Sequence, residues 1–198
     1  MPKRKYEFDP NPLSTHARVA RLVGGNKTVL DIGCAGGYIG AQLAQAGCTV
    51  DGIDLDSLEP GNRKAYRKFW KADVEKLSVK GKYDVVILAD ILEHLREPGA
   101  LLKKLGANLK AGGHLVVSIP NVANWKTRLH LLSGNWRYRE TGILDRTHLK
   151  FYTRASARAL LESNGYKIEH EEWTGFLGSA WMWPSLLAFQ FIFKAAKV

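Results

Sequence analysis

The residues of this sequence that could do acid–base chemistry include six histidines, and an acid lies three residues before one of them. Asp145 precedes His148 by three residues in GILDRTHLKFYT. A carboxylate can fix the tautomer of an imidazole and stabilise its charged form, so this pair predicts a general base and the group that orients it. The alternative is that Asp145 and His148 only hold their own segment together by hydrogen bonds.

A third candidate catalytic residue is His94, which lies just past an apolar run at 83–90. We expect it either to contact a ligand crevice or to pack in the interior. A metal site made of Asp145, His148 and His94 would lack any recognised ligand spacing, so no metal is predicted.

A second chemistry-bearing feature is the glycine-rich loop in DIGCAGGYIG at 31–40. Gly33 and Gly37 allow a sharp turn and close approach of a ligand to the backbone, next to the free N–H groups of a following helix. The dinucleotide fingerprint G-x-G-x-x-G would place Ala35 at its second glycine and Tyr38 at its last. A tyrosine there prevents close packing of helix on strand, which disfavours NAD. Cys34 is expected to be a packing residue.

The elements that must position these residues alternate between apolar runs and helical patterns. Strands are expected at 28–33, 49–54, 68–73, 83–90 and 114–120, with helical patterns at 38–47, in a basic stretch after Asp56, and at 98–113. This order is typical of a parallel sheet with helices on both faces. Thr153 is expected to cap a helix that ends near Gly165, followed by a strand at 166–173.

The segment 121–152 interrupts this alternation, because it is long, polar, aromatic and basic. In open parallel sheets, ligands bind beyond the carboxyl ends of the strands. The segment follows the fifth predicted strand, so we expect it to reach that crevice from the substrate side.

The combined motifs resemble the class I S-adenosylmethionine-dependent methyltransferases. V-L-D-x-G-x-A-x-G matches the loop that accommodates the methionine part of the cofactor, with Ala35 in place of the usual middle glycine. Asp54 stands where the family binds the ribose hydroxyls, and Asp73 where it meets the adenine amino group. ADILEHL at 89–95 is similar to the family's EHL signature. The cofactor-binding residues implied are Asp31, Gly33, Cys34, Ala35, Gly37, Asp54, Leu55, Asp73, Val74 and Ala89.

The resemblance implies an α/β fold, Rossmann-like and doubly wound, with a mostly parallel seven-stranded sheet. It implies one methyltransferase domain over 1–198, divided into an N-terminal lid or helix (1–27), a cofactor-binding core (28–120), a substrate-side insertion (121–152), and a last helix with closing strands (153–198). Tyr6 and His16 are expected in the lid. The motif GxLDxTHxxFYT is similar to a branch often associated with cell-surface glycans and lipid-linked metabolites, which implies methyl transfer to a small-molecule or glycan hydroxyl.

The net charge of +10 is distributed unevenly. Residues 31–60 hold five acids and no Lys or Arg, whereas residues 121–160 hold eight basic residues and two acids. An acidic cofactor side and a basic insertion predict an anionic acceptor. The residues expected to bind it are Asn121, Arg137, Arg139 and Arg146.

Two other functions compete with this interpretation. The basic surplus also suits an RNA methyltransferase, but Ala89-Asp90-Ile91-Leu92 lacks the Asn/Asp-Pro-Pro-aromatic motif of enzymes that methylate base amines. A nucleic-acid partner is therefore not expected. The second alternative is a non-catalytic, cofactor-binding protein at a membrane periphery, suggested by the aromatic tail.

The tail itself is uncharged over 21 positions, from Trp173 to Phe193. That length would suffice for a membrane-spanning helix. Pro184 breaks the pattern, and LLAFQFIFKA is rich in residues that strands favour, so a strand is the preferred interpretation. Trp181 and Trp183 suit an interfacial role. The start of the chain lacks the apolar stretch of a secretory signal, and two cysteines suit a reduced, cytoplasmic protein.

Overall fold

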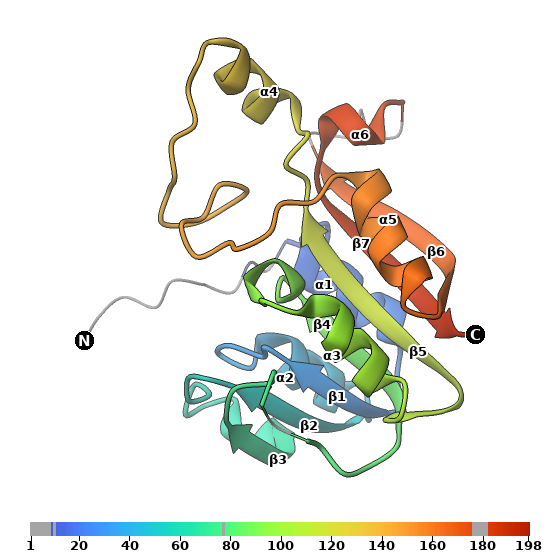
Figure 1. Cartoon of the computed structure of the whole chain (residues 1–198). Helices are drawn as coiled ribbons and strands as arrows, with labels where there is room; N and C mark the ends of the chain where they lie inside the picture. Colours follow the sequence, from blue (N-terminus) through green and yellow to red (C-terminus); the bar gives the residue numbers. More distant parts are fainter. Residues whose placement is uncertain (1–8, 10, 77, 176–181) are drawn as a thin grey trace.

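In the computed structural model, the described residues are 9, 11–76, 78–175 and 182–198. They form a seven-stranded sheet in the order β3-β2-β1-β4-β5-β7-β6, in which β7 runs antiparallel to both neighbours (Figure 1). The strands are β1 (Thr28–Ile32), β2 (Thr49–Asp54), β3 (Tyr66–Lys71), β4 (Tyr83–Ala89), β5 (Leu109–Pro120), β6 (Tyr166–Gly175) and β7 (Ala188–Lys197). The helices are α1 (Thr15–Val23), α2 (Tyr38–Gln45), α3 (Pro98–Leu105), α4 (Trp125–Leu132), α5 (Arg154–Ser163) and α6 (Pro184–Leu187), with 3₁₀ turns η1 (Arg63–Ala65) and η2 (Leu92–His94). The predicted doubly wound class is confirmed.

Two apolar cores lie on opposite faces of the sheet. Alternate residues of β4 divide between them, because successive strand side chains point to opposite faces. Val85 and Ile87 join the core under α1 and α2, whereas Val86 and Leu88 join the core under α3 and α5. Burial on both faces accounts for the nearly continuous VVIL run in the sequence.

Two predicted helices are shorter than expected. The basic stretch after Asp56 forms only the 3₁₀ turn η1, and its basic residues continue into β3 and the following loop. The helical pattern predicted to reach Gly113 ends at Leu105, and residues 109–113 belong to β5 instead. The pairing of Tyr83 with Leu109 extends β5 backwards, which local pattern alone did not indicate.

Local signals at the C-terminal part were interpreted correctly. The Thr153 side chain accepts a hydrogen bond from the Ser156 backbone N–H, and the Ser156 side chain accepts one from Thr153, which completes a capping box. The tail forms strand β7, as preferred over a membrane span. In the described part of the chain, no helix has both the length and the apolar character needed to cross a membrane.

The segment predicted as a lid is only partly described, and Tyr6 lies outside the described residues. His16 lies in the first turn of α1, whose Val19 and Val23 are fully buried against the sheet. Helix α1 is therefore part of the helical layer on one face. The insertion 121–152 rises beyond the carboxyl ends of β4 and β5, with α4 at its outer end (Figure 1).

Candidate functional site

The glycine loop turns tightly between β1 and α2. Gly33, Ala35 and Gly37 all have positive φ, at 72°, 47° and 82°. A Cβ at Gly33 would come 2.8 Å from Ile91 Cδ1, and one at Gly37 would come 2.8 Å from Leu58 Cδ2, so packing as well as conformation requires glycine at both positions.

The side chain of Asp54, at the end of β2, connects this loop to the sheet by hydrogen bonds. One carboxylate oxygen accepts a hydrogen bond of 2.7 Å from the Ala35 N–H, and the other accepts one of 2.8 Å from the Asp56 N–H. The tight loop, the acid at the next strand end and the open N-terminus of α2 form the arrangement expected around a nucleoside with an amino-acid tail.

Asp31 lies beneath the loop and is almost completely buried. It accepts a hydrogen bond of 2.6 Å from the Tyr66 hydroxyl, while its other oxygen has no hydrogen-bond partner among the described residues. Burial raises the pKa of Asp31 to about 6. A cationic amino group nearby would compensate this charge, so the buried acid fits the amino-acid end of S-adenosylmethionine.

The remaining predicted cofactor residues surround this loop or follow β3. Cys34 is buried, and burial strongly raises the pKa of its thiol, as suits packing. Leu55 is exposed, and Ala89 is half-buried at the end of β4. Asp73 accepts a hydrogen bond from the Glu75 N–H and pairs with Lys76, while Val74 packs against the core.

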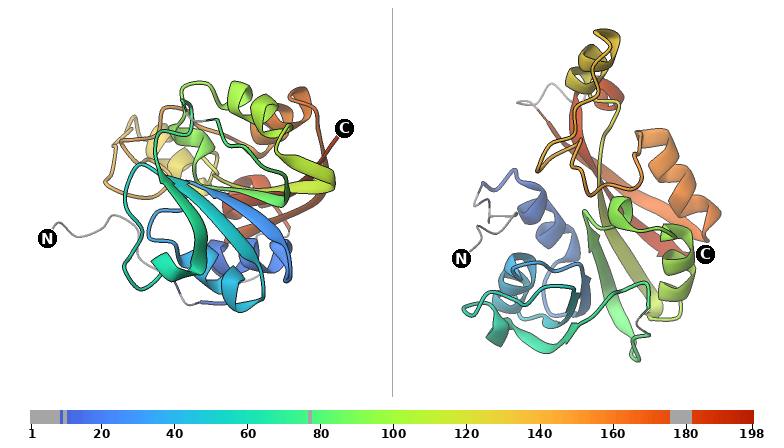
Figure 2. Two further views of the ribbon diagram at one scale, coloured as in Figure 1. Left: turned by 90° about the horizontal axis from the view of Figure 1, so that it is seen from below. Right: turned by 60° about the vertical axis from the view of Figure 1, so that its left-hand side comes forward.

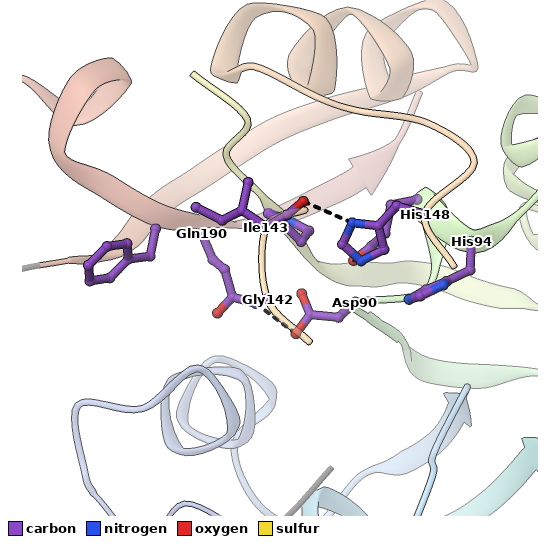
Figure 3. A pocket seen from close by; sticks show the side chains of 9 residues that line it. Asp90, His94, Gly142, Ile143, His148 and Gln190 are labelled. Atoms are coloured by element: carbon purple, nitrogen blue, oxygen red, sulfur yellow. Dashed lines mark hydrogen bonds and ion pairs between the residues drawn. The ribbon is translucent and has the colours of Figure 1, made fainter. Parts of the chain in front are cut away.

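A cavity of about 320 Å³ opens beyond the carboxyl ends of β4 and β5 (Figure 3). It brings together residues from η2, the insertion and β7 that lie far apart in the sequence. The lining residues are Asp90, Glu93, His94, Pro120, Gly142, Ile143, His148, Phe189 and Gln190. The structure therefore places two of the three predicted catalytic residues, His94 and His148, on one cavity wall.

The imidazole of His148 is held in one orientation. Its Nδ1 lies 3.1 Å from the Ile143 carbonyl oxygen, which can only accept a hydrogen bond, so Nδ1 carries the proton (Figure 3). Its Nε2 lies 3.9 Å from Oε1 of Glu93. In the neutral ring, Nε2 is therefore the nitrogen that can accept a proton.

Glu93 is a cavity-lining residue that the sequence did not single out as a candidate. Its side chain is almost completely buried, and neither carboxylate oxygen has a hydrogen-bond partner among the described residues. Desolvation, with the nearby Asp90 charge as the second cause, raises its pKa well above the usual range. Its position in ADILEHL was the available signal, but its burial beside His148 was not evident from sequence.

His94 lies against His148, with the ring centroids 4.7 Å apart. Its Nδ1 lies 3.2 Å from the Thr147 carbonyl oxygen. The ligand atoms of Glu93, His94 and His148 all lie within 4.8 Å of one another, so this set could hold a divalent cation. Imidazoles whose second nitrogen donates to a carbonyl are typical of metal ligands.

Asp145, the predicted orienting partner of His148, is fully buried. Its Oδ1 accepts hydrogen bonds from the backbone N–H and the hydroxyl of Thr147, and its backbone carbonyl accepts one from the His148 N–H. These contacts give Asp145 a structural role within its own segment. The Ile143 carbonyl oxygen is one partner of the His148 Nδ1.

The residues predicted to bind the acceptor lie outside the cavity lining. Asn121 is fully buried, and its amide donates to the carbonyls of Ser185 and Ala188, so it joins the insertion to the tail. The other three residues, Arg137, Arg139 and Arg146, are exposed in the insertion. Arg146 forms an ion pair with Glu140.

Asp90 is a further cavity residue that the sequence did not single out. Its φ of 51° is uncommon for a side-chain-bearing residue. Its carboxylate accepts a hydrogen bond of 2.9 Å from the Ser118 hydroxyl. It also accepts one of 2.8 Å from the Gln190 amide (Figure 3). Burial raises its pKa. Backbone strain of this kind is stored at functional sites, which agrees with its place on the cavity wall.

Comparison with known proteins places this geometry in context. A family model described as a methyltransferase domain matches residues 9–171. The chain is 34% identical over 146 residues to the ubiquinone biosynthesis O-methyltransferase of Nitrosomonas europaea, covering 65% of this chain and 60% of that protein. It is 35% identical over 142 residues to the enzyme of that name from Paraburkholderia xenovorans, covering 67% of this chain and 60% of that protein. The chain thus spans about three fifths of the length of these curated relatives.

Solved structures agree on the fold. A magnesium protoporphyrin IX methyltransferase from Synechocystis, with bound S-adenosylhomocysteine, matches with a TM-score of 0.65 at 25% identity, over 92% of this chain and 81% of that one. The 1,6-didemethyltoxoflavin N1-methyltransferase of Burkholderia thailandensis matches with a TM-score of 0.66 at 16% identity, over 95% of this chain and 77% of that one.

Proposed function

The chain belongs to the S-adenosylmethionine-dependent methyltransferases, and on that premise we propose that it methylates a hydroxyl of a small-molecule acceptor bound in the cavity. The observation that carries this proposal is the fixed imidazole of His148, whose Nε2 can accept a proton on the cavity wall. The curated relatives, named as O-methyltransferases, support a hydroxyl as the acceptor group.

Residues on one side of the crevice would bind the cofactor, and residues on the other side would bind the acceptor. When bound, S-adenosylmethionine supplies an electrophilic methyl group. The glycine loop, Asp31, Asp54 and Asp73 would hold the cofactor, and the cavity would align the acceptor and exclude water. His148 Nε2 would take the hydroxyl proton as the oxygen attacks, at a position 3.9 Å from Oε1 of the Glu93 carboxyl group.

The charge pattern further supports an acceptor with two chemically different ends. Asp90 and Glu93 line the cavity, so a neutral hydroxyl-bearing end suits the interior. Arg137 and Arg139 lie outside it, where they suit a carboxylate, a phosphate or an anionic glycan carried at the other end. The acceptor would therefore be anionic, with its negative charge outside the cavity beside these arginines.

A second role for the same side chains is favoured by one specific observation. Both His94 and His148 have Nδ1 next to backbone carbonyls, and one ring nitrogen of each lies within 4.8 Å of a Glu93 carboxylate oxygen. A divalent cation held there would lower the pKa of an acceptor hydroxyl, in place of a general base.

The proposal is tested by His148→Ala with methyl-labelled cofactor and a panel of phenols, catechols and hydroxylated glycans. Loss of the base should lower turnover about 10²-fold to 10⁴-fold, with cofactor affinity unchanged in calorimetry. His130→Ala, on exposed α4 in the same insertion, is the matched control and should retain full turnover.

Equal turnover of the two variants would contradict the role of His148. Turnover by the wild-type protein that is abolished by a chelator and restored by a divalent cation would assign the three side chains to a cation instead. Binding of NAD in place of S-adenosylmethionine would contradict the cofactor assignment.

A further inference from the structure

The outer end of the molecule carries a cluster of exposed apolar side chains. They lie on α4 and just before α6, and the largest exposed fractions are 85% for Leu132, 71% for Met182 and 68% for Trp183. We call this the tip surface and define it by Trp125, Leu129, Leu131, Leu132, Met182 and Trp183. A patch of large apolar side chains that stays exposed on a folded domain marks an interaction site.

The two parts of the tip surface are held side by side. The Asn124 amide, at the start of α4, donates a hydrogen bond of 2.9 Å to the Ala188 carbonyl at the end of α6. The Asn121 amide donates to the Ser185 carbonyl within α6. Two views show α4 and α6 together at the end of the molecule farthest from β3 (Figures 1 and 2).

The insertion that carries α4 is positively charged. The insertion 121–152 contains six Lys and Arg residues and two acids. One of these acids, Asp145, is buried, and the other, Glu140, pairs with Arg146. Lys126 and Arg128 are exposed on α4, and the Lys126 ammonium group lies 5.6 Å from the centroid of the Trp125 ring, so the tip surface presents apolar and cationic side chains together.

We propose that the tip surface docks the protein onto the surface of a membrane that contains anionic lipids. Leucine, methionine and tryptophan side chains would enter the boundary between headgroups and acyl chains, while Lys126 and Arg128 remain at the headgroups. Helix α4 has eight residues, about 12 Å in length, and lies in the interface without crossing the bilayer. Because the basic residues of α4 complement the negative charge of anionic lipid, a membrane is favoured over an apolar protein partner or a second copy of the chain as the binding partner of the tip surface.

Docking in this way would place the cavity close to the membrane. Phe189 and Gln190 line the cavity and directly follow the α6 segment. An acceptor with a polar head and a long apolar chain could keep that chain in the bilayer while its head enters the cavity. The docking itself does not depend on the proposed function, because it requires neither cofactor nor turnover.

The experiment is flotation of the full chain with vesicles of phosphatidylcholine alone, or of equal parts phosphatidylcholine and phosphatidylglycerol. We expect binding to the mixed vesicles, weakened by salt. In the double variant Leu131→Glu/Leu132→Glu, the affinity for the mixed vesicles should fall at least about tenfold. Two leucines that would insert into the membrane are replaced there by carboxylates that the anionic lipids repel. Arg128→Gln should lower it roughly fivefold, as expected for one cation at an anionic surface.

Leu13→Glu, at a leucine just before α1 that is 60% exposed compared with 58% for Leu131, is the control and should bind the vesicles like the wild-type protein. Unchanged circular dichroism and cofactor affinity would show that each variant is folded. Failure of the wild-type protein to bind mixed vesicles would overturn the proposal, as would equal binding by the control and the double variant. A concentration-dependent dimer that the double variant abolishes would assign the tip surface to a second copy of the chain.

Discussion

Three carboxyl groups in or beneath the site have raised pKa values: the buried Asp31 and Glu93, and the half-buried Asp90. Desolvation is the largest cause for each of them. Such groups cost stability when ionised, and proteins retain them where a ligand or a reaction uses the charge. At this scale the structure separates two roles, since Asp31 lies under the glycine loop and Glu93 faces His148.

Asp31 should give the protein a stability that depends on pH. The folded protein keeps a proton on Asp31 between pH 3.8 and about 6, where the unfolded chain has already released it. The free energy of unfolding therefore contains a part that is present at low pH and lost as pH rises through this window. Asp31→Asn does not titrate, so it should exceed the wild-type stability at pH 8 by up to about 3 kcal/mol and lose this advantage toward pH 4.

Urea unfolding at pH 4 and pH 8 measures this difference, with exposed Asp56→Asn as a control that should follow the wild-type protein. The stabilised Asp31→Asn variant should bind S-adenosylmethionine more weakly. A constant difference at both pH values would refute the burial-based explanation.

At the scale of elements, the cofactor side depends on a loop joined to the neighbouring strand. The Ala35 N–H donates to Asp54, so the acid expected at the ribose also fixes the loop between β1 and α2. The substrate side depends on the insertion, whose Leu149 and Lys150 N–H groups both donate to the Glu93 carbonyl. Phe151 packs its ring near His148 and thereby contributes to the wall that carries the imidazole.

Asp54→Asn should weaken S-adenosylmethionine binding about 10-fold to 100-fold, because the amide replaces a charged acceptor. Calorimetry against Asp56→Asn makes the comparison, since Asp56 lies two residues further on and is exposed. Equal affinities of the two variants would exclude Asp54 from the cofactor site.

At the scale of the whole molecule, the first helix and the last strand meet beside the cavity. The Thr15 hydroxyl in α1 donates to the Gln190 side-chain oxygen, and the Gln190 amide in turn donates to Asp90 at the end of β4. The Ser118 hydroxyl, from β5, donates to the other oxygen of Asp90. This series of hydrogen bonds joins the first helix and the last strand to the centre of the sheet.

Gln190→Ala should lower the free energy of unfolding by about 1–3 kcal/mol, because it leaves a buried carboxylate oxygen of Asp90 without its donor. Thr15→Val removes only the outer hydrogen bond and should cost about 1 kcal/mol or less. Urea titration compares them, and a larger loss in Thr15→Val would contradict the importance of the contact between Gln190 and Asp90.

The sequence by itself determined the fold class, the glycine loop and the methyltransferase family, because these depend on local periodicity and on motifs of fixed spacing. It also indicated His94 and His148 as candidate catalytic residues. Only the tertiary structure decided that Ile143 orients His148 and that Glu93 is buried beside it. Only the tertiary structure shows that β5 begins at Leu109, because pairing with Tyr83 of β4 places residues 109–113 in a strand although their local pattern indicated a helix. These features depend on contacts and burial between segments far apart in the chain, which a local pattern does not encode.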